Sequence, residues 1–544
     1  MKSKTRTTPH RIASPAIVIL ALTLTAGPAK GTALDDYVAT PDAHYEYFVA
    51  NVIPGPGFTA YVLDMKSQKW RTEAQVDRPV WQHWLTVMVP NTLLYDTALL
   101  FITGGGNGGS PPSSLDDELF LLGNIAVKSN SVTAVLEMVP NERLKFTDEL
   151  DPRYKDRGRT EDEIIAYTFD KYLTTGDPTW PLLCPMVKSA VRAMDTIQLY
   201  APSVTGGVHI NQFVVSGGSK RGWTTWLTAA VDGRVVAIVP FVIDVLNMDD
   251  QMDHHFSAYG FFSPAIEDYV DLNIMPRLAS AGGVNLRRIV DPYEYRDRFK
   301  NLPKLMINAT GDEFFLPDSS QFYFDDLPGE KHLRYVPNAN HGLGGSDAIE
   351  TLLIYHQSVL LKLPRPKFTW EVLPNGTIRV ETADTPAQVN LWQATNPIVR
   401  IFVNGFGASP WTPTPLTDQG GGVYLGSVSI PATGWTAYMV ELIFDSGTPV
   451  PYKFTTEVHV LPEFLPFAKV ADNDEDGDVD GVDFLVFAAC YNGANNPPRS
   501  LACPPTAKDL FDYDDDNDVD IVDFATFARC YNGAGKPPRL CSIP

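Results

Sequence analysis

A regular alternation of apolar, strand-like runs with helical stretches constrains the fold of this chain more than any other feature of its sequence. The apolar runs, rich in β-branched residues, lie at 98–103, 132–139, 210–216, 235–243 and 304–310. Helical patterns lie between them, for example at 162–173 and 186–201. Strands that alternate with helices form a mostly parallel sheet with helices on both faces. The central part of the chain is therefore predicted to have an α/β fold.

The regions on either side of this core have a strand pattern without helices. Residues 40–89 alternate apolar and polar side chains, which predicts antiparallel strands. After Leu363 the sequence is punctuated by proline, and alternating segments such as TIRVET, VRIFV, VYLGSVSI, AYMVELIF and YKFTTEVHVL continue to about Pro462. This second pattern predicts a β-sandwich. With 544 residues, the chain is also long enough for three or four domains.

The N-terminus has the pattern of an export signal. Basic residues within the first 11 positions precede an apolar run at 12–25, and small residues follow it. The run is shorter than the roughly 20 apolar residues that span a bilayer, so a cleaved signal peptide is favoured over a retained anchor. Cleavage is expected near Ala29 or Ala33, and the protein is expected to be secreted, periplasmic or at the cell surface.

Ser219 is the predicted nucleophile of a hydrolase site. The strand at 210–216 runs into Gly217-Gly218-Ser219-Lys220-Arg221-Gly222, and a helix-compatible stretch follows. A sharp turn from strand to helix exposes a serine hydroxyl at the edge of a sheet, and glycines allow the backbone to pack closely there. The spacing G-x-S-x-x-G differs from the usual G-x-S-x-G, so an ordinary glycine-rich turn is the alternative reading of the motif.

The order of the residues that follow supports a catalytic triad. In α/β-hydrolases an acid and then a histidine come after the nucleophile, each behind a later strand. Asp312 follows the strand at 304–310, and His341 follows a short strand in HLRYVPNANHGLGG. Histidine would accept the serine proton and the carboxylate would fix its tautomer. Asp244, which ends the strand at 235–243, is the alternative acid.

An oxyanion hole is predicted from two backbone segments. The N–H of Lys220 directly follows the nucleophile, and a second N–H would come from Gly105 or Gly106 in the glycine run 104–109. A flexible loop is the simpler interpretation of that run. A phosphate-binding loop is disfavoured because the G-K-[ST] ending is missing.

The C-terminal tail contains a duplicated acidic motif that predicts two calcium sites. The segment from Asp472 aligns with the segment from Asp512, at an offset of 40 residues. Oxygen ligands at loop positions 1, 3, 5, 7, 9 and 12 wrap a calcium ion in EF-type loops, position 7 through its backbone carbonyl. The predicted ligands are Asp472, Asp474, Asp476, Asp478, Asp480 and Asp483 in the first loop and Asp512, Asp514, Asp516, Asp518, Asp520 and Asp523 in the second.

Charge and cysteine content agree with an exported, calcium-binding tail. The net charge of −22 argues against nucleic acid as the main partner. From residue 472 onward, 15 acidic residues face 5 basic ones, an excess that bound cations would neutralise. The simplest disulfide pairing joins Cys490 to Cys503 and Cys530 to Cys541. Other pairings remain open, and a zinc site lacks the expected CxxC spacing or a nearby histidine.

Two resemblances extend these predictions. The paired loop-and-helix units at 472–541 resemble a type I dockerin, which implies calcium-dependent folding and docking to a cohesin-like or cell-surface partner. The strings SGGSKRGWTTWLTAAVDGRVVAIVPFVIDVLNM, INATGDEFFLPDSS and VPNANHGL resemble the PhoPQ-activated pathogenicity-related family. That resemblance implies an α/β-hydrolase fold with a β-rich C-terminal extension, and it matches Ser219, Asp312 and His341.

The expected organisation and function follow from these motifs. We expect a signal peptide at 1–33, an α/β-hydrolase domain at 34–363, a β-sandwich at 364–462, a linker at 463–471 and the dockerin-like repeat at 472–544. The expected function is ester hydrolysis through an acyl-enzyme on Ser219, without a catalytic cofactor, on a small-molecule or saccharide ester. A serine peptidase and a non-catalytic secreted signalling or binding protein on the same fold are the alternatives.

Overall fold

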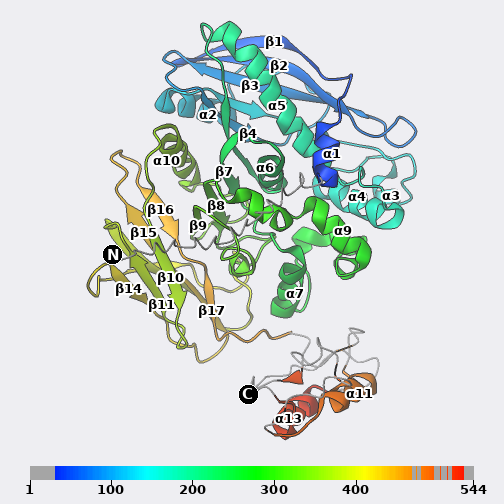
Figure 1. Ribbon diagram of the computed structural model, residues 1–544, viewed down its shortest axis with the longest axis vertical. Coiled ribbons are helices and arrows are strands. Elements are labelled where there is room, and N and C mark those ends of the chain that lie inside the picture. The colour runs from blue at the N-terminus through cyan, green and yellow to red at the C-terminus, as the bar shows by residue number, and fades with distance from the viewer. Residues whose placement is uncertain are drawn as a thin grey trace, which may run out of the picture.

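One mixed sheet forms the body of the molecule (Figure 1). The computed structural model describes residues 31–467, 473, 479–494, 496, 503, 511–512 and 518–531. The sheet has 14 strands, of which β1 to β9 follow the order β1-β2-β3-β5-β4-β6-β7-β8-β9. These strands are β1 (Glu46–Gly55), β2 (Phe58–Lys69), β3 (Val80–Pro90), β4 (Thr97–Ile102), β5 (Thr133–Leu136), β6 (Gln212–Gly218), β7 (Val235–Phe241), β8 (Lys304–Ala309) and β9 (Lys331–Val336).

The first three strands pair antiparallel, and the central strands pair parallel, as the sequence predicts. The strands β1, β2 and β3 form a meander, and β3 pairs antiparallel with β5. From β5 through β4, β6, β7 and β8 to β9, every pairing is parallel. All predicted strands of the α/β core are therefore present, and their ends that carry Ser219, Asp312 and His341 lie at the same edge of the sheet.

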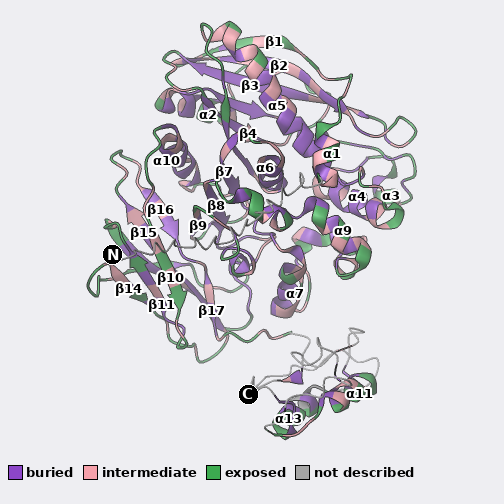
Figure 2. Ribbon diagram, in the orientation of Figure 1, coloured by how far each residue is buried: buried purple, intermediate pink, exposed green. Residues whose placement is uncertain are grey.

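Helices cover both faces of this sheet, which explains the nearly continuous apolar runs. In β6, Phe213 and Val215 face a core shared with α5 and α6, whereas Val214 faces a core shared with α2 and α10. Because successive side chains of a strand point to opposite faces, a strand covered on both sides needs apolar residues at every position. Figure 2 shows the central strands buried along their length. In residues 31–467, the α-helices outside the cap are α1 (Ala33–Ala39), α2 (Asp117–Ser129), α3 (Pro152–Lys155), α4 (Glu161–Thr175), α5 (Leu183–Val204), α6 (Lys220–Val231) and α10 (Ala348–Leu360).

A cap of short helices is inserted between β7 and β8. The cap contains the α-helices α7 (Met248–Tyr259), α8 (Glu267–Asp271) and α9 (Ala281–Val290) and the 3₁₀ helices η1 (Pro264–Ile266), η2 (Met275–Arg277) and η3 (Pro292–Phe299). A further 3₁₀ helix, η4 (Ser319–Phe322), follows β8. The insertion begins directly after the strand next to the one that carries Ser219, so it lies beside the predicted nucleophile.

The C-terminal strands form two facing layers, and one layer continues the sheet of the body. The continuing strands are β12 (Gln388–Asn396), β13 (Thr412–Pro415), β15 (Trp435–Phe444), β16 (Tyr452–Thr455) and β17 (His459–Leu461), joined to β9 by the pairing of Thr455 with Leu333. The second layer is a three-stranded sheet of β10 (Phe368–Val372), β11 (Ile378–Thr382) and β14 (Val423–Gly426). Both layers share one hydrophobic core with α2 and α10. The sequence did not indicate that the two sheets would be continuous.

One predicted strand is wrong. The segment VRIFV at 399–403 lies in an irregular loop between β12 and β13. Its alternation has another cause, because Ile401 and Val403 pack with Tyr259 and Leu316 in a small cluster, while Arg400 forms a buried ion pair.

The described part of the tail contains two related helices, α11 (Gly481–Cys490) and α13 (Ile521–Cys530). They pack through aromatic rings, with the rings of Phe487 and Phe527 stacked at 4.9 Å. The predicted disulfide between Cys490 and Cys503 is present. Cys541 and the side chain of Cys530 lie outside the described residues, as do residues 1–30. Among the helices that the structure describes, none combines the length and the apolar character needed to cross a membrane.

Candidate active site

Ser219 lies at the turn between β6 and α6, in a strained backbone conformation. Its φ is 56° and its ψ is −128°, a region that residues with a side chain rarely adopt. The N–H of Ser219 donates to the carbonyl of Phe241 at 2.9 Å, which ties the turn to the neighbouring strand β7. This geometry is that of a nucleophile elbow, which lifts the hydroxyl above the sheet edge and places it at the N-terminus of a helix.

Two glycines of the motif are needed because other backbone atoms lie where a side chain would be. A Cβ on Gly217 would lie 2.9 Å from the carbonyl oxygens of Ile102 and Arg221. A Cβ on Gly222 would lie 2.9 Å from the carbonyl oxygen of Phe241. The longer spacing G-x-S-x-x-G therefore serves the same purpose as the usual one, since glycine allows α6 to pack directly against β6 and β7.

His341 is held by Asp312. The first lies in the loop after β9 and the second in the loop after β8, and Nδ1 of His341 is 2.9 Å from both carboxylate oxygens of Asp312. Asp312 is buried, and its Oδ1 also accepts the N–H of Phe314 at 2.8 Å. An ionised carboxylate can only accept, so Nδ1 carries the proton and Nε2 is the basic nitrogen. That Nε2 is buried and has no hydrogen-bond partner within the described residues.

Ser219 and His341 open onto the same pocket. This pocket has a volume of about 280 Å³, and its wall also contains Phe101, Leu343 and Ser346. The structure thus brings together the three predicted triad residues, two of them by a direct hydrogen bond and the third through the pocket that it shares with His341. In the described residues Ser219 makes no hydrogen bond to His341.

Asp244, the alternative acid, has a different environment. Its carboxylate accepts hydrogen bonds from the hydroxyls of Tyr323 and Tyr335 and, among the described residues, forms no hydrogen bond with His341. Burial raises the pKa of Asp244 to about 7, in spite of these two hydrogen bonds. The structure therefore pairs the histidine with Asp312 and leaves Asp244 in a buried cluster with two tyrosines.

Lys220 combines a backbone and a side-chain feature. As the first residue of α6, it has an N–H without an intrahelical acceptor, which suits the predicted oxyanion donor. Its buried side chain forms ion pairs with Glu161 at 2.7 Å and Asp162 at 2.8 Å, which the sequence did not indicate. Burial alone would raise the pKa of Glu161, but Lys220 and Arg221 lower it below its ordinary value.

The glycine run 104–109 follows β4, the strand next to β6. Gly105 has a φ of +124°, and the carbonyl of Gly104 accepts the N–H of Met138 at 2.7 Å. Gly106 pairs with Glu142 in an isolated bridge. Neither Gly105 nor Gly106 lines the pocket that Ser219 shares with His341. The second oxyanion donor therefore stays a prediction.

The structure describes six of the twelve predicted calcium ligands: Asp480, Asp483, Asp512, Asp518, Asp520 and Asp523. Asp518, Asp520 and Asp523 each place a carboxylate oxygen within 4.8 Å of the others. Asp480 and Asp520 cap α11 and α13, and their backbone N–H groups donate to Asp483 at 2.8 Å and to Asp523 at 2.7 Å. Asp472, Asp474, Asp476, Asp478, Asp514 and Asp516 lie outside the described residues.

A buried ion pair behind the acid loop was missed by sequence reasoning. Asp318 accepts hydrogen bonds from Arg400 at 2.6 Å and from Nε2 of His254 at 3.0 Å, and all three side chains are buried. A single arginine within the apolar string VRIFV was the available signal, because a charged residue among buried ones needs a partner.

The strand order and the site define the class of the protein. A nucleophile elbow after a central parallel strand, followed in chain order by an acid and a histidine behind two later strands, is the α/β-hydrolase arrangement. Residues 34–402 match the family model described as PhoPQ-activated pathogenicity-related protein. The chain belongs to this family.

A curated relative and several solved structures resemble the chain. Autocrine proliferation repressor protein A of Dictyostelium discoideum is 36% identical over 494 residues, which cover 86% of this chain and 97% of the relative. Acetyl xylan esterase 1 from Thermoanaerobacterium sp. JW/SL YS485 is 15% identical with a TM-score of 0.39, over 57% of this chain and 86% of that one. An acetyl xylan esterase from Paenibacillus sp. R4 is 13% identical with a TM-score of 0.41, over 60% of this chain and 92% of that one.

Proposed function

We propose that this protein is an exported serine hydrolase that cleaves esters through Ser219, His341 and Asp312. One observation carries the proposal: His341, whose Nδ1 is held by Asp312, lines the same pocket as Ser219 at the strand-to-helix turn. In this mechanism Nε2 accepts the proton of Ser219 as Oγ attacks the carbonyl carbon, and then gives it to the leaving alcohol. Water hydrolyses the acyl-enzyme by the same proton transfers in reverse.

A fluorophosphonate probe tests this proposal directly. Wild type is expected to be labelled, and Ser219→Ala is expected to lose labelling completely. Ser346→Ala is the matched control, because Ser346 lines the same pocket without a role in the chemistry. Absence of labelling in wild type, or equal labelling in Ser219→Ala, would refute the proposal.

The identity of the acid can be tested by measuring ester turnover. Asp312→Asn is expected to reduce ester turnover by roughly 10⁴-fold, because the amide cannot hold the required tautomer of His341. Asp244→Asn is expected to keep most of the activity, since its contacts are with Tyr323 and Tyr335. The opposite ranking would show that Asp244 is the acid.

A second candidate function is signalling without catalysis. The name of the Dictyostelium relative describes repression of proliferation, not a reaction. If wild type binds no probe, the non-catalytic role is favoured. If it is labelled but hydrolyses peptide p-nitroanilides faster than p-nitrophenyl esters, the protein is a serine peptidase.

We also propose that the tail binds two calcium ions and docks a partner. The carboxylates gathered at Asp518, Asp520 and Asp523 fit a hard cation. Calorimetric titration of the full chain with calcium chloride should give two sites for wild type. Asp483→Ala and Asp523→Ala should each remove one of them, so that each variant is the control for the other. An unchanged stoichiometry in both variants would contradict the assignment.

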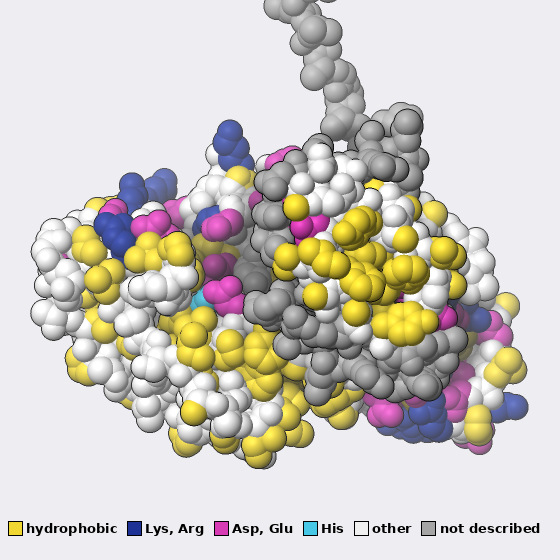
Figure 3. Space-filling model, turned by 90° about the horizontal axis from the view of Figure 1, so that it is seen from below, with side chains coloured by type: hydrophobic (Ala, Val, Ile, Leu, Met, Phe, Trp, Pro, Cys, Tyr) yellow, Lys and Arg dark blue, Asp and Glu magenta, His cyan; other side chains and the backbone are white. Residues whose placement is uncertain are grey.

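The docking proposal is supported by exposed apolar side chains on both tail helices. Leu485 on α11 is 69% exposed and Ile521 on α13 is 63% exposed, with Val482 and Val522 beside them. Figure 3 shows hydrophobic side chains gathered on the end of the molecule that faces the viewer. A cohesin-like or cell-surface partner is proposed, and Leu485→Asp with Ile521→Asp should abolish its binding without changing esterase activity.

A further inference from the structure

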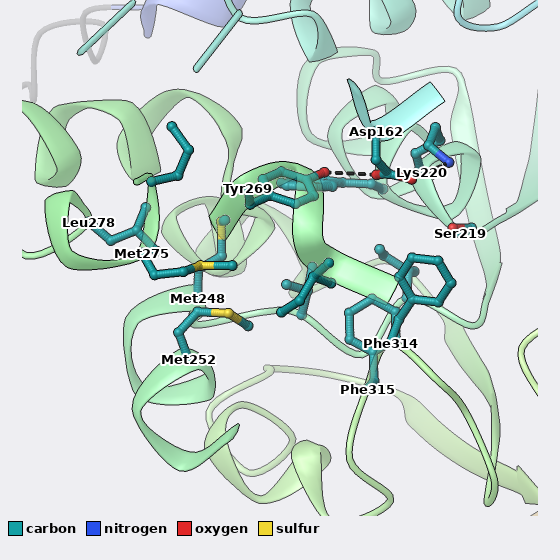
Figure 4. Close-up of a pocket in the computed structure, with 15 residues that line it drawn as sticks. Asp162, Ser219, Lys220, Met248, Met252, Tyr269, Met275, Leu278, Phe314 and Phe315 are labelled. Carbon is teal, nitrogen blue, oxygen red and sulfur yellow. Dashed lines mark hydrogen bonds and ion pairs between the residues drawn. The ribbon is translucent and has the colours of Figure 1, made fainter. Parts of the chain in front are cut away.

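A second cavity reaches Ser219 from the side of the cap. Its volume is about 60 Å³, and its lining is almost entirely apolar, supplied mainly by the cap and by the aromatic pair after Asp312. Figure 4 shows Ser219 at one end and Met248, Met252, Met275 and Leu278 at the other, with Phe314 and Phe315 along one side. Ser219 lines both this cavity and the larger pocket, whereas His341 lines only the larger one.

The position of His341 decides which part of a substrate enters which pocket. When the tetrahedral intermediate collapses, Nε2 of His341 gives its proton to the oxygen of the departing alcohol. The alcohol must therefore lie on the side of His341, in the pocket of about 280 Å³. The acyl chain, attached to the same carbonyl carbon, is then directed into the cap cavity, which Ser219 lines and His341 does not. The ring of Phe314, whose centroid is 4.2 Å from that of the His341 ring, forms part of the wall of this cavity.

The polar groups at the edge of the cap cavity are already paired with one another. Nζ of Lys220 is 2.8 Å from Asp162, and the hydroxyl of Tyr269 donates to the same carboxyl group at 2.8 Å. A hydroxyl or a carboxylate on the acyl chain would lose its water without gaining a partner from these groups, which is costly. The cavity thus favours an unsubstituted hydrocarbon chain.

The volume limits the length of that chain. The volume of about 60 Å³ is the space open to the centre of a water-sized sphere, and one water-sized group needs about 15 Å³ of it. The cavity therefore has room for about four such groups. We propose that the cap cavity is the acyl site, and that the substrates are esters of short, unsubstituted fatty acids with up to about four carbons beyond the carbonyl. This inference rests on the proposed esterase function.

The proposed reaction consumes only the ester and one water molecule. Oγ of Ser219 forms a bond to the carbonyl carbon, the bond from that carbon to the alcohol oxygen breaks, and the alcohol leaves with the proton from His341. Water then attacks the acyl-serine, and the short acid leaves the cap cavity. The larger pocket, of about 280 Å³, has room for a bulky alcohol group.

A p-nitrophenyl ester series tests the inference, because the alcohol stays constant while the acyl chain grows. For wild type, kcat/KM should rise about fourfold per added methylene from acetate to pentanoate, the value expected for burying a CH₂ group, and fall at least tenfold at octanoate. Met275, half-buried at the far end of the cavity, is the position to change. Met275→Ala should move the optimum to longer chains, and Met275→Trp should move it to acetate.

Controls separate this inference from the proposed function. Leu343→Ala enlarges the pocket that contains His341 and should leave the chain-length profile unchanged. If all variants react with the fluorophosphonate probe but the Met275 variants keep the wild-type profile, the acyl-site inference is wrong and the hydrolase function stands. If wild type neither reacts with the probe nor cleaves any ester, both proposals fail together.

Discussion

The buried pair of Asp318 and Arg400 joins the β-rich C-terminal part to the loop that carries Asp312. Arg400 lies between β12 and β13 and is 5% exposed, and Asp318, six positions after the acid, is 3% exposed. Burial alone would raise the pKa of Asp318, but Arg400 and His254 hold it well below its ordinary range. Asp318 is therefore ionised in the folded protein because two partners compensate for the lost water.

Replacing Arg400 with methionine tests how much this junction stabilises the fold. Arg400→Met keeps the apolar stem but leaves the carboxylate of Asp318 without its main cation. A buried ion pair broken on one side costs about 3–5 kcal/mol, because one charge stays buried and uncompensated. We expect the free energy of unfolding, measured by urea denaturation with tryptophan fluorescence, to fall by this amount, and ester turnover to fall as the loop around Asp312 loses its anchor.

A double variant shows whether the uncompensated charge is the cause. Asp318→Asn in the Arg400→Met background removes the charge and should recover at least half of the lost stability. Arg379→Met, at an exposed pair with Glu371, is the control and should have little effect. A loss of less than about 1 kcal/mol for Arg400→Met, which is below the range expected for a broken buried pair, would show that this pair does not stabilise the fold. A double variant no more stable than the single one would show that the uncompensated charge is not the cause of the loss.

Contacts of Asp244, Thr32 and Gly222 should also have measurable effects on stability. The pKa of Asp244 is raised to about 7, so between pH 4 and pH 7 the folded state holds a proton that the unfolded state has lost. The free energy of unfolding should therefore fall by at most about 4 kcal/mol as pH rises from 4 to 7. Urea denaturation at pH 5 and pH 8 should show a weaker pH dependence for Asp244→Asn than for wild type, and parallel profiles would contradict this. Thr32 caps α1 and exchanges hydrogen bonds with Asp35, so Thr32→Ala should lower the free energy of unfolding by about 1 kcal/mol. Mass spectrometry should find the mature N-terminus before Thr32, because cleavage near Ala29 keeps this cap and cleavage at Ala33 removes it. Gly222→Ala places a methyl group against the carbonyl of Phe241 and should destabilise the protein by about 1–3 kcal/mol, whereas an unchanged urea midpoint would rule out the close contact.

The local patterns of the sequence predicted the central strands of the sheet and the chain order of the site residues. Apolar runs at 98–103, 210–216 and 304–310 predicted β4, β6 and β8 to within two residues, because a strand buried on both faces has no room for polar residues. The positions of Ser219, Asp312 and His341 behind β6, β8 and β9 could also be predicted, since the loops at the carboxyl ends of parallel strands meet at one edge.

Contacts between distant segments were decided only by the tertiary structure. The choice of Asp312 over Asp244 as the partner of His341 depends on which strand end faces the histidine, and both aspartates follow equally apolar strands. The segment VRIFV has the alternation of a strand, but its arginine pairs with Asp318, 82 positions away in the sequence. The cap cavity likewise depends on how residues between β7 and β8 fold back over Ser219. Periodicity reports the burial of a side chain, whereas the partner that buries it is set by packing between segments that the sequence does not place side by side.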